Sequence, residues 1–353
     1  MKPKKFATLR DIAKLAGTSV TSVSYILSGD QKRYVSDELR QKVLKAADEL
    51  NYVKSALATG LKGQNRKMLA MLVPQFDNIF FTRLTAGVEE VAYKHGYILN
   101  VCNSLDNSER EREIIENLVM HRIDGILISP TESSADNIRY IRDFGIPFMV
   151  VDRALNDMTD CDAVLTDNLN AGYLAAKLLL EAGHRSIAFV EWQTKIPNLK
   201  DRLWGCVKAF EEAKLPKEHI LSLSYQDLKN TQGSQIVAEI TKAGEVTGVI
   251  FGHHNLAEKF FGYVFQNKIA AIVDSLSFVM IGNPVWSNFC HPLITCIDPR
   301  EHEIGREAAL RLIKKIEAED ERNVASPTSI VIGCKIKPGD SVKKLIGSAH
   351  PKH

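Results

Sequence analysis

The spacing of apolar side chains near the N-terminus predicts a bundle of three short helices. Counted from Leu9, one stripe of the first helix is apolar and can pack against a second helix; it consists of Ile12, Ala13 and Ala16. Gly17 follows at the point where a turn needs a residue that tolerates a positive φ. The sequence therefore predicts a helix, a tight turn and a second helix, the arrangement of a helix-turn-helix motif.

The second helix should run from Val20 to Leu27, with Ser19 as its N-cap and Val23 and Ile26 on its buried face. Its outward side chains would then be those of Thr21, Ser22 and Tyr25, which could face the major groove of DNA. A third helix should start at Ser36, have acidic residues in its first turn and continue to Leu50. The alternative is an ordinary helical hairpin that matches the pattern by chance.

From Met68 onward, short apolar runs alternate with longer amphipathic stretches. The expected strands are Met68 to Val73, Tyr97 to Val101, Gly125 to Ser129, Phe148 to Val151, Ser186 to Val190, Val246 to Phe251 and Phe278 to Ile281. The expected helices are Thr82 to His95, Glu109 to His121, Ala135 to Asp143, Asn170 to Ala182 and Arg300 to Ala318. This alternation predicts an α/β core of parallel sheets with helices on both faces, and its length favours two sheets over one.

Ligands of open parallel sheets bind beyond the carboxyl ends of the strands, so the residues that follow strands are candidates for a binding cleft. These residues are Phe80, Phe81, Asp152, Arg153, Glu191, Trp192, His253, His254 and Asn283. The mixture of rings, charges and amides suits a small polar ligand with an apolar face. The alternative for each charged residue taken singly is a surface ion pair.

Composition limits the class of protein. The chain has 353 residues, of which 45% are hydrophobic, enough for a large core and a small extra domain. It contains no apolar run of the ~18 residues that a membrane span needs, and the basic first residues are followed by polar ones, so we expect a cytoplasmic protein. Its six cysteines are scattered singly, which favours reduced thiols.

Charge is distributed unevenly along the chain. Residues 1–67 hold 14 Lys or Arg against 6 Asp or Glu, a net charge of +8, whereas the other 286 residues hold 31 against 37. A basic N-terminal unit on a mildly acidic body is the asymmetry expected when only one end meets phosphates.

Enzymes and free solute-binding proteins are the main alternatives. His302 and Glu303 begin like a zinc-protease helix, but the second histidine is absent, and we find neither a phosphate loop nor a nucleophile elbow. The pairs His253-His254 and Cys290-His291 are weak metal candidates, because adjacent ligands are usually structural. We therefore expect no catalytic residues, metal or cofactor. A solute-binding protein would need an export signal and would have no use for a basic helix-turn-helix.

Several motifs in the right order resemble those of the lactose-repressor (LacI/GalR) family of bacterial transcription regulators. They are Thr8-Leu9-Arg10-Asp11-Ile12-Ala13, Ala16-Gly17-Thr18-Ser19, Val23-Ser24, Ala47-Asp48-Glu49-Leu50-Asn51-Tyr52, Val164-Leu-Thr-Asp167-Asn168, Gly183-His184-Arg185, Arg202-Leu-Trp-Gly205 and Pro292-Leu-Ile-Thr295. The resemblance spans nearly the whole chain. It implies a DNA-binding head, a hinge and a periplasmic-binding-protein-like core with two subdomains.

On this resemblance the head spans 6–53, the hinge 54–66, the core 67–341 and a tail 342–353. The N-subdomain would comprise 67–166 and 297–325, and the C-subdomain 167–296 and 326–341. The expected DNA contacts are Leu9, Arg10, Ser19, Val20, Thr21, Ser22, Tyr25, Ser28, Ser36, Tyr52, Ser55, Ala58, Leu61 and Lys62. In the family the hinge folds on DNA and a leucine wedges into the minor groove, here Leu61; the alternative is a flexible linker.

The same resemblance places Asp152 and Arg202 at effector-binding positions. The full expected effector set is Phe80, Phe81, Asp152, Arg153, Trp192, Arg202, His253 and Asn283. The chain departs from the family where His253-His254 replaces an Asn-Asp pair and where Gly282-Asn283-Pro284-Val285 lacks a carboxylate that often holds a sugar hydroxyl. In the head, Tyr25 replaces a common arginine, and the loop from Ser28 to Val35 is about two residues longer than in the lactose repressor.

The function implied is a repressor that binds a palindromic operator as a homodimer, located in the bacterial cytoplasm and on the nucleoid when bound. A small polar metabolite in the core cleft, most simply a sugar or sugar derivative, would control it allosterically. The alternative is a regulator with a vestigial or non-sugar cleft.

Overall fold

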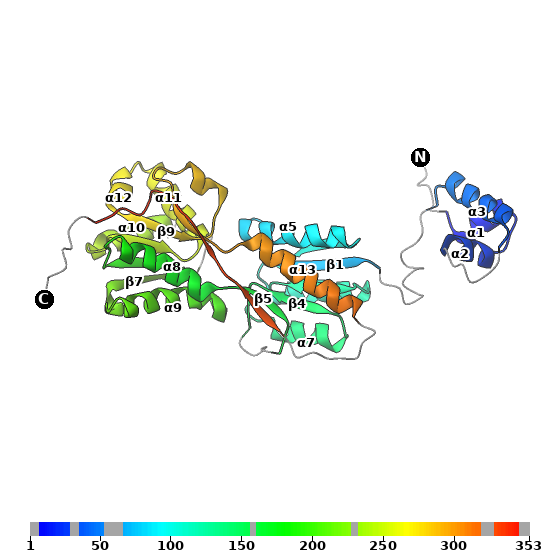
Figure 1. Cartoon of the computed structure of the whole chain (residues 1–353), viewed down its shortest axis with the longest axis horizontal. Coiled ribbons are helices and arrows are strands. Elements are labelled where there is room, and N and C mark those ends of the chain that lie inside the picture. The colour runs from blue at the N-terminus through cyan, green and yellow to red at the C-terminus, as the bar shows by residue number, and fades with distance from the viewer. Residues whose placement is uncertain are drawn as a thin grey trace. The chain divides into compact units, whose positions relative to one another are not determined.

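The computed structural model describes residues 7–28, 35–52, 66–155, 160–226, 232–318 and 328–345. The chain divides into two compact units between Arg66 and Lys67, the first helical and the second α/β (Figure 1). The predicted hinge, 54–66, lies almost wholly outside the described residues. Within the described ranges, none of the helices has the length and apolar content needed to cross a membrane.

The first unit contains the three predicted helices, α1 (Leu9–Ala16), α2 (Val20–Ser28) and α3 (Asp37–Glu49). Thr8 and Asp11 form a capping box at the start of α1, and Gly17 ends the helix in the left-handed conformation, with φ 65°. A small core holds the helices together; its fully or nearly buried members are Ile12, Ala13, Val23, Ile26, Val43 and Ala46. These residues confirm the apolar stripes predicted from the spacing.

The second unit is built on two sheets, as the alternating pattern predicted, and each sheet has six strands, which together exceed the seven strands that were predicted. The first has the order β11-β5-β4-β3-β1-β2, and the second β12-β10-β9-β8-β6-β7. The strands of the first sheet are β1 (Met68–Val73), β2 (Ile98–Asn103), β3 (Gly125–Ile128), β4 (Phe148–Val151), β5 (Ala163–Thr166) and β11 (Ser329–Ile332). Those of the second are β6 (Ile187–Trp192), β7 (Ile220–Tyr225), β8 (Gly248–Phe251), β9 (Ser277–Ile281), β10 (Thr295–Asp298) and β12 (Lys335–Lys337). All neighbouring strands are parallel except β10 and β12.

Helices cover both faces of each sheet, because the buried strands are apolar on both sides. The first sheet carries α5 (Ile79–Lys94) and α13 (Glu301–Glu317) on one face and α6 (Ser108–Met120) and α7 (Ala135–Asp143) on the other. The second carries α8 (Asn168–Glu181) and α9 (Pro197–Glu212) on one face and α10 (Gln232–Ala243), α11 (His254–Gln266) and α12 (Ala270–Ser275) on the other. Two short 3-10 helices complete the described elements, η1 (Lys217–His219) and η2 (Val285–Phe289).

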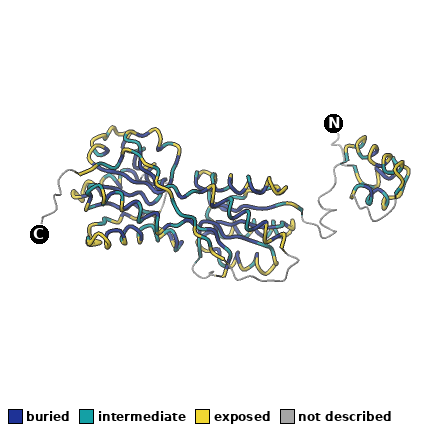
Figure 2. The backbone as a smooth tube through the Cα atoms, in the orientation of Figure 1, coloured by how far each residue is buried: buried dark blue, intermediate teal, exposed yellow. Residues whose placement is uncertain are grey.

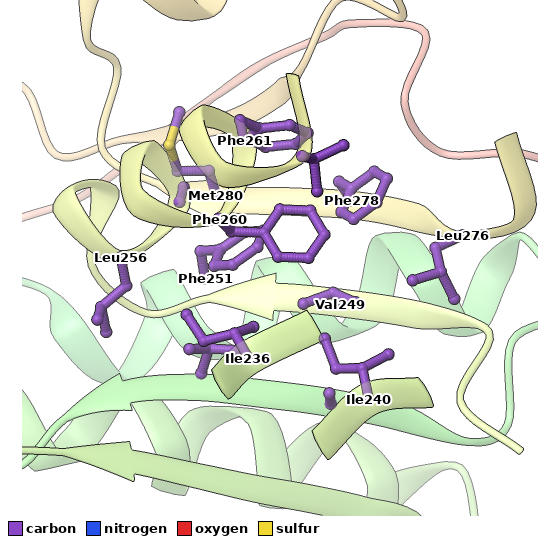
Figure 3. Close-up of a cluster of buried hydrophobic side chains, with 14 of the residues drawn as sticks. Ile236, Ile240, Val249, Phe251, Leu256, Phe260, Phe261, Leu276, Phe278 and Met280 are labelled. Carbon is purple, nitrogen blue, oxygen red and sulfur yellow. The ribbon is translucent and has the colours of Figure 1, made fainter. Parts of the chain in front are cut away.

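Aromatic packing fixes α11 on the second sheet. Phe251 and Phe278 on the strands meet Phe260 and Phe261 on the helix, with ring centroids 5.2 to 5.9 Å apart (Figure 3). Figure 2 shows that the inner strands of the unit are buried, whereas the outward faces of the helices are exposed. The strand ends that follow these cores are therefore held in fixed positions.

The chain crosses between the two sheets three times, and the crossings touch one another (Figure 1). The backbone N–H of Asp167 donates to Ile332 at 3.0 Å, and the Arg300 guanidinium donates to the Gly333 carbonyl at 3.3 Å. Each sheet with its helices forms one subdomain, so these contacts form the joint between an N-subdomain and a C-subdomain.

Three of the predicted boundaries are wrong. β11 pairs with β5 and belongs to the N-subdomain, whereas 326–341 was assigned entirely to the C-subdomain. The second crossing follows Asp298, because β10 pairs with β9 as far as Ile297 and with β12 as far as Asp298, so both residues belong to the second sheet. The predicted tail also starts too early, since Val342 packs in the core and the N–H of Leu345 donates to the Ala182 carbonyl at 2.9 Å.

Candidate functional site

The outer face of α2 is the candidate DNA-reading surface. Ser19 caps the helix as predicted, because its Oγ accepts from the Ser22 N–H at 3.1 Å. Val20 is 41% exposed, Thr21 is exposed, and Ser22 and Tyr25 are half-buried. The helix therefore presents the predicted side chains along its outer surface, while Val23 and Ile26 hold its inner face.

The other predicted DNA contacts differ in placement. Arg10 is exposed, whereas Leu9 and Tyr52 pack against the core of the head. The Ser28 hydroxyl donates to the Tyr25 carbonyl at 2.9 Å, and Ser36 caps α3. Four predicted contacts in the hinge lie outside the described residues: Ser55, Ala58, Leu61 and Lys62.

The core has a cleft at the carboxyl ends of the strands of both sheets, where the fold favours ligand binding. Seven of the eight predicted effector contacts line one inner cavity of about 30 Å³: Phe80, Phe81, Asp152, Arg153, Trp192, Arg202 and His253. His254, Asn78 and Leu199 line it too. The fold thus brings residues as far apart in the sequence as Phe80 and His253 into the lining of one small inner cavity.

Asp152 is the buried acid of this inner cavity. It follows β4 with φ 66°, is only 4% exposed, and accepts from the Thr166 hydroxyl at 3.4 Å. Burial raises the pKa of its carboxyl group to about 6, although the charges of Arg202 and Arg153 act in the opposite direction. Its protonation therefore changes near neutral pH.

Arg202 is held by α8 and α9 against the cavity. Its Nε donates to Asn168 Oδ1 at 2.7 Å and its guanidinium donates to the Gly252 carbonyl at 2.6 Å. The two helices approach closely, because a Cβ at Gly172 would overlap the Arg202 carbonyl and one at Gly205 would overlap the Leu169 carbonyl. Close helix packing thus sets the position of the arginine.

Arg153 reaches across the cavity from the N-subdomain. Its guanidinium is 2.7 Å from Asp106 and lies 5.7 Å from the ring of Phe81 and 5.5 Å from that of Trp192. Both distances fall within the range of a cation–π contact. The arginine therefore pairs with a carboxylate and lies close to two aromatic rings.

Two histidines complete the cavity wall. The rings of His253 and His254 stack with centroids 4.9 Å apart, and His253 Nδ1 accepts from the Asn255 N–H at 3.3 Å. Burial lowers the pKa of both imidazoles, and the nearby charge of Arg202 lowers it further. At neutral pH they are uncharged groups that each offer one donor and one acceptor. Among the described residues, no group of three or more His, Cys, Asp or Glu is arranged to hold a metal ion.

Asn283 does not contribute to the described lining of either cavity. Its amide donates to Asp298 at 3.1 Å and accepts from Lys337 at 2.8 Å, and its backbone carbonyl accepts from Arg83 of the N-subdomain at 2.6 Å. Both side-chain partners, Asp298 of β10 and Lys337 of β12, belong to the C-subdomain, and only the backbone carbonyl of Asn283 contacts the N-subdomain. Its prediction as an effector contact has no support in this geometry.

A larger outer cleft of about 770 Å³ adjoins the inner cavity through Trp192, which lines both. Apart from Trp192 and Glu191, the residues around it were missed: Asp106, Ser108, Thr131, Glu132, Ser133, Gln193, Thr194, Lys195, Lys200, Leu203, Trp204, Ser224 and Gln226. Most lie in or next to the loops that follow β2, β3 and β6, and the others lie on α9 or at the end of β7. One signal was present, since a tryptophan two residues after Arg202 on an otherwise polar helix face is unusual.

Two hydrogen-bonded contacts join the subdomains across the cleft. Glu132 Oε1 accepts from the Thr194 hydroxyl at 2.8 Å and from the Lys195 N–H at 2.7 Å. The Asn198 side chain donates to the Asp152 carbonyl at 2.6 Å and accepts from the Ala154 N–H at 2.9 Å. These contacts hold the two walls of the cleft together, so a ligand must act on them to enter or leave.

Comparison with known families supports this architecture in both units. The model described as "Bacterial regulatory proteins, lacI family" matches residues 8–55. The model described as "Periplasmic binding proteins and sugar binding domain of LacI family" matches residues 66–337. Together they cover the head and nearly all of the core, which is more than half of the chain.

Individual relatives cover most of the chain. The HTH-type transcriptional repressor PurR of Vibrio parahaemolyticus is 31% identical over 324 residues, which are 90% of this chain and 95% of the relative. A PurR of Haemophilus influenzae is 29% identical over 319 residues, 89% of this chain and 93% of the relative.

Solved structures show the same fold. A LacI family transcriptional regulator from Enterococcus faecium with bound ribose is 27% identical, with a TM-score of 0.69 over 79% of this chain and 99% of the other. The Lac repressor dimer bound to operator and the anti-inducer ONPF is 19% identical, with a TM-score of 0.80 over 96% of this chain and all of the other. The chain therefore belongs to the LacI family, as its motifs indicated, and is a DNA-binding transcriptional repressor with an effector-binding core rather than an enzyme.

Proposed function

We propose that this repressor binds a palindromic operator as a homodimer and that a small polar metabolite, most simply a sugar, changes its affinity for that operator. The observation that carries the proposal is the cleft between two hydrogen-bonded subdomains, which is lined by side chains from both. A ligand that favours one degree of closure would shift the population of repressor conformations.

Base recognition is assigned to the outer face of α2, through Val20, Thr21 and Tyr25. An arginine at position 25 could read guanine through two hydrogen bonds, to O6 and N7, but the single hydroxyl of tyrosine cannot form that pair. We therefore expect the operator to differ from the usual family half-site at one base. Arg10 and the polar side chains around α2 would contact phosphates and fix the orientation of the head.

The hinge is assigned to residues 54–66, with Leu61 as the side chain that enters the minor groove. A wedge of this type unstacks a base step and bends the duplex. Two hinges that order together at the centre of a palindrome would make DNA binding sensitive to the spacing of the two cores.

The homodimer is supported by exposed apolar side chains in both subdomains. Ile98 on β2 is 66% exposed, and Tyr93 at the end of α5 is 78% exposed. In the C-subdomain, Phe289 of η2 is 77% exposed. Large exposed apolar side chains of this kind mark protein interfaces, and a second copy of the chain matches the two-fold symmetry of a palindrome.

A sugar is supported by the chemistry of the inner cavity. Asp152, Arg202 and two neutral histidines can hydrogen-bond hydroxyl groups, while Phe81 and Trp192 offer rings to the carbon skeleton. The matching family model describes a sugar-binding domain, and the Enterococcus faecium regulator was solved with ribose.

The experiment is selection of duplexes bound by the full-length protein from a random DNA pool at fixed salt, with and without a panel of sugars and nucleosides. A palindromic consensus whose recovery changes with a sugar supports the whole proposal. A consensus that no compound changes would contradict effector control, and the absence of any consensus would contradict specific operator binding.

A further inference from the structure

We infer that Glu111 is a positioning residue for closure of the core cleft. It lines neither described cavity, but it holds in place the two loops that form the N-subdomain wall of the outer cleft. The inference rests on the proposed function for its consequence, a part in effector binding, and goes beyond it by assigning that part to a side chain outside the cleft. Its burial, its hydrogen-bond donors and the loops that it joins carry the inference.

Glu111 is a fully buried acid on α6, with 0% of its surface exposed. Its carboxylate accepts from the Thr131 N–H at 2.9 Å, from the Asn137 side-chain amide at 2.8 Å, and from the hydroxyls of Ser134 and Thr131. Burial raises the pKa of this carboxyl group, whereas the hydrogen bonds from Asn137, Ser134 and Thr131 act in the opposite direction. Every partner is a donor, so an acceptor-only carboxylate satisfies all of them and a neutral amide cannot.

Glu111 also fixes the start of α7. Ser134 is the N-cap residue of that helix, but its hydroxyl donates to Glu111 rather than capping its own helix. Asn137 lies in the first turn of α7 and donates to the same carboxylate. A negative charge is stabilised beside a helix N-terminus, because the first N–H groups and the helix dipole face it. The end of the loop between β3 and α7 is therefore set by a side chain of α6.

The same network reaches a second loop. The Asn137 amide also donates to the carbonyl of Ser108, the first residue of α6, which follows the loop after β2. The residues of the N-subdomain that line the outer cleft all come from the segments 106–108 and 131–133: Asp106, Ser108, Thr131, Glu132 and Ser133. One buried carboxylate, with Asn137, thus holds both segments of this wall.

Glu132 links this network to closure. It follows Thr131, whose N–H and hydroxyl both donate to Glu111. Across the cleft, Glu132 Oε1 accepts from the Thr194 hydroxyl at 2.8 Å and from the Lys195 N–H at 2.7 Å. Hydrogen bonds weaken steeply once donor and acceptor move beyond about 3.5 Å, so a shift of the loop by about 1 Å would break these contacts. Glu111 therefore acts on the C-subdomain although its own hydrogen bonds stay within the N-subdomain.

The test is hydrogen exchange of the full-length protein without any ligand, measured by mass spectrometry with fragmentation to single residues. Glu111→Ala should speed exchange of the Lys195 amide roughly tenfold, the equivalent of about 1.4 kcal/mol and of about one net hydrogen bond. Two amides report on the cores: Ile126, which donates to Pro147, and Gly252, which donates to Val190. Both should stay within about twofold of the unchanged protein. An equal loss of protection at all three amides would show general destabilisation and overturn the positioning role.

Further variants make the result specific to Glu111. Glu111→Gln keeps the size of the side chain but turns N–H groups toward donors, so exchange at Lys195 should rise by an intermediate factor, and this variant serves if the alanine variant does not fold. Glu113→Ala removes an exposed acid from the same helix and should change nothing.

A double-mutant cycle tests whether Glu111 acts through Glu132. Glu132→Ala removes the acceptor and should speed exchange of the Lys195 amide, and adding Glu111→Ala should speed it no further. Additive effects, or unchanged exchange at Lys195 in both Glu111 variants, would overturn the inference. These outcomes would leave the proposed function intact because the experiment contains no ligand, whereas the absence of an effector would contradict the proposed function alone.

Discussion

Replacement of Asp152 by asparagine should stabilise the core at neutral pH. The side chain is nearly fully buried, and its carboxyl pKa is about 6 in the folded protein against 3.8 as the ordinary value. Asparagine has almost the same shape, can accept from the Thr166 hydroxyl, and tolerates the positive φ at this position. The substitution therefore removes the charge with little other change.

The magnitude follows from the difference between the two pKa values. A raised pKa in the folded state means that the folded protein binds the proton more tightly than the unfolded chain, so Asp152 lowers stability as pH rises from about 4 to above 6. The two pKa values differ by about 2.2, and each pKa unit corresponds to about 1.36 kcal/mol, so the ionised Asp152 lowers the free energy of unfolding by ~3 kcal/mol at pH 7. Asp152→Asn should therefore be more stable than the unchanged protein by up to ~3 kcal/mol at pH 7 and equal to it near pH 4.

Urea unfolding of both proteins between pH 4 and pH 8, followed by circular dichroism, measures this difference. Asp160→Asn is a matched control, because Asp160 is exposed and the nearby Arg142 lowers its carboxyl pKa. That control should gain no stability at neutral pH. If Asp152→Asn is equally or less stable than the unchanged protein at pH 7, the attraction of Arg202 and Arg153 outweighs burial and the reasoning fails.

Three other substitutions test separate parts of the account. Tyr25→Ala should relax preference at one base of each half-site by roughly 1–3 kcal/mol in binding to operator variants, and an equal loss on all sequences would refute a reading role. Gly172→Ala should destabilise the core by ~1–3 kcal/mol in urea unfolding, because its methyl group would overlap the Arg202 carbonyl. The control Gly262→Ala, where the added methyl group meets open space, should stabilise the core by up to ~1 kcal/mol. Equal effects of the two substitutions would argue against close packing of α8 on α9. Asn198→Ala removes two hydrogen bonds that hold the cleft closed. The substitution should weaken effector binding by roughly 5- to 150-fold in calorimetry. An unchanged affinity would show that closure of the cleft does not depend on these two hydrogen bonds.

The helical head could be predicted from sequence almost residue by residue. Its signals are local: the Ser19 N-cap, the turn at Gly17 and apolar spacings of three and four all act within one or two helical turns. Seven of the described strands were predicted from their short apolar runs for the same reason, whereas β5, β7, β10 and β11 were not predicted. β12 was not found, because Lys335–Lys337 is a short polar strand that only its pairing with β10 stabilises.

The lining of the inner cavity could be predicted from the sequence, whereas most of the lining of the outer cleft could not. Positions that follow recognisable strands, such as Asp152 and His253, line the inner cavity, and their role as effector contacts stays a prediction. The outer cleft depends on which loops of two subdomains face each other, and no local pattern encodes that arrangement. Asn283 follows a strand as well, yet the turn at Pro284 directs it to Asp298 and Lys337 rather than into the cavity.

The central claim is that the cleft and the operator are energetically coupled, and a closed thermodynamic cycle tests it most directly. Operator affinity would be measured by fluorescence anisotropy with and without the selected sugar, and sugar affinity by calorimetry with and without the operator duplex. The account predicts that both affinities change by the same factor, between about 5- and 150-fold, because coupling between two sites is reciprocal. Sugar binding with identical affinity for the free and the operator-bound repressor would contradict it.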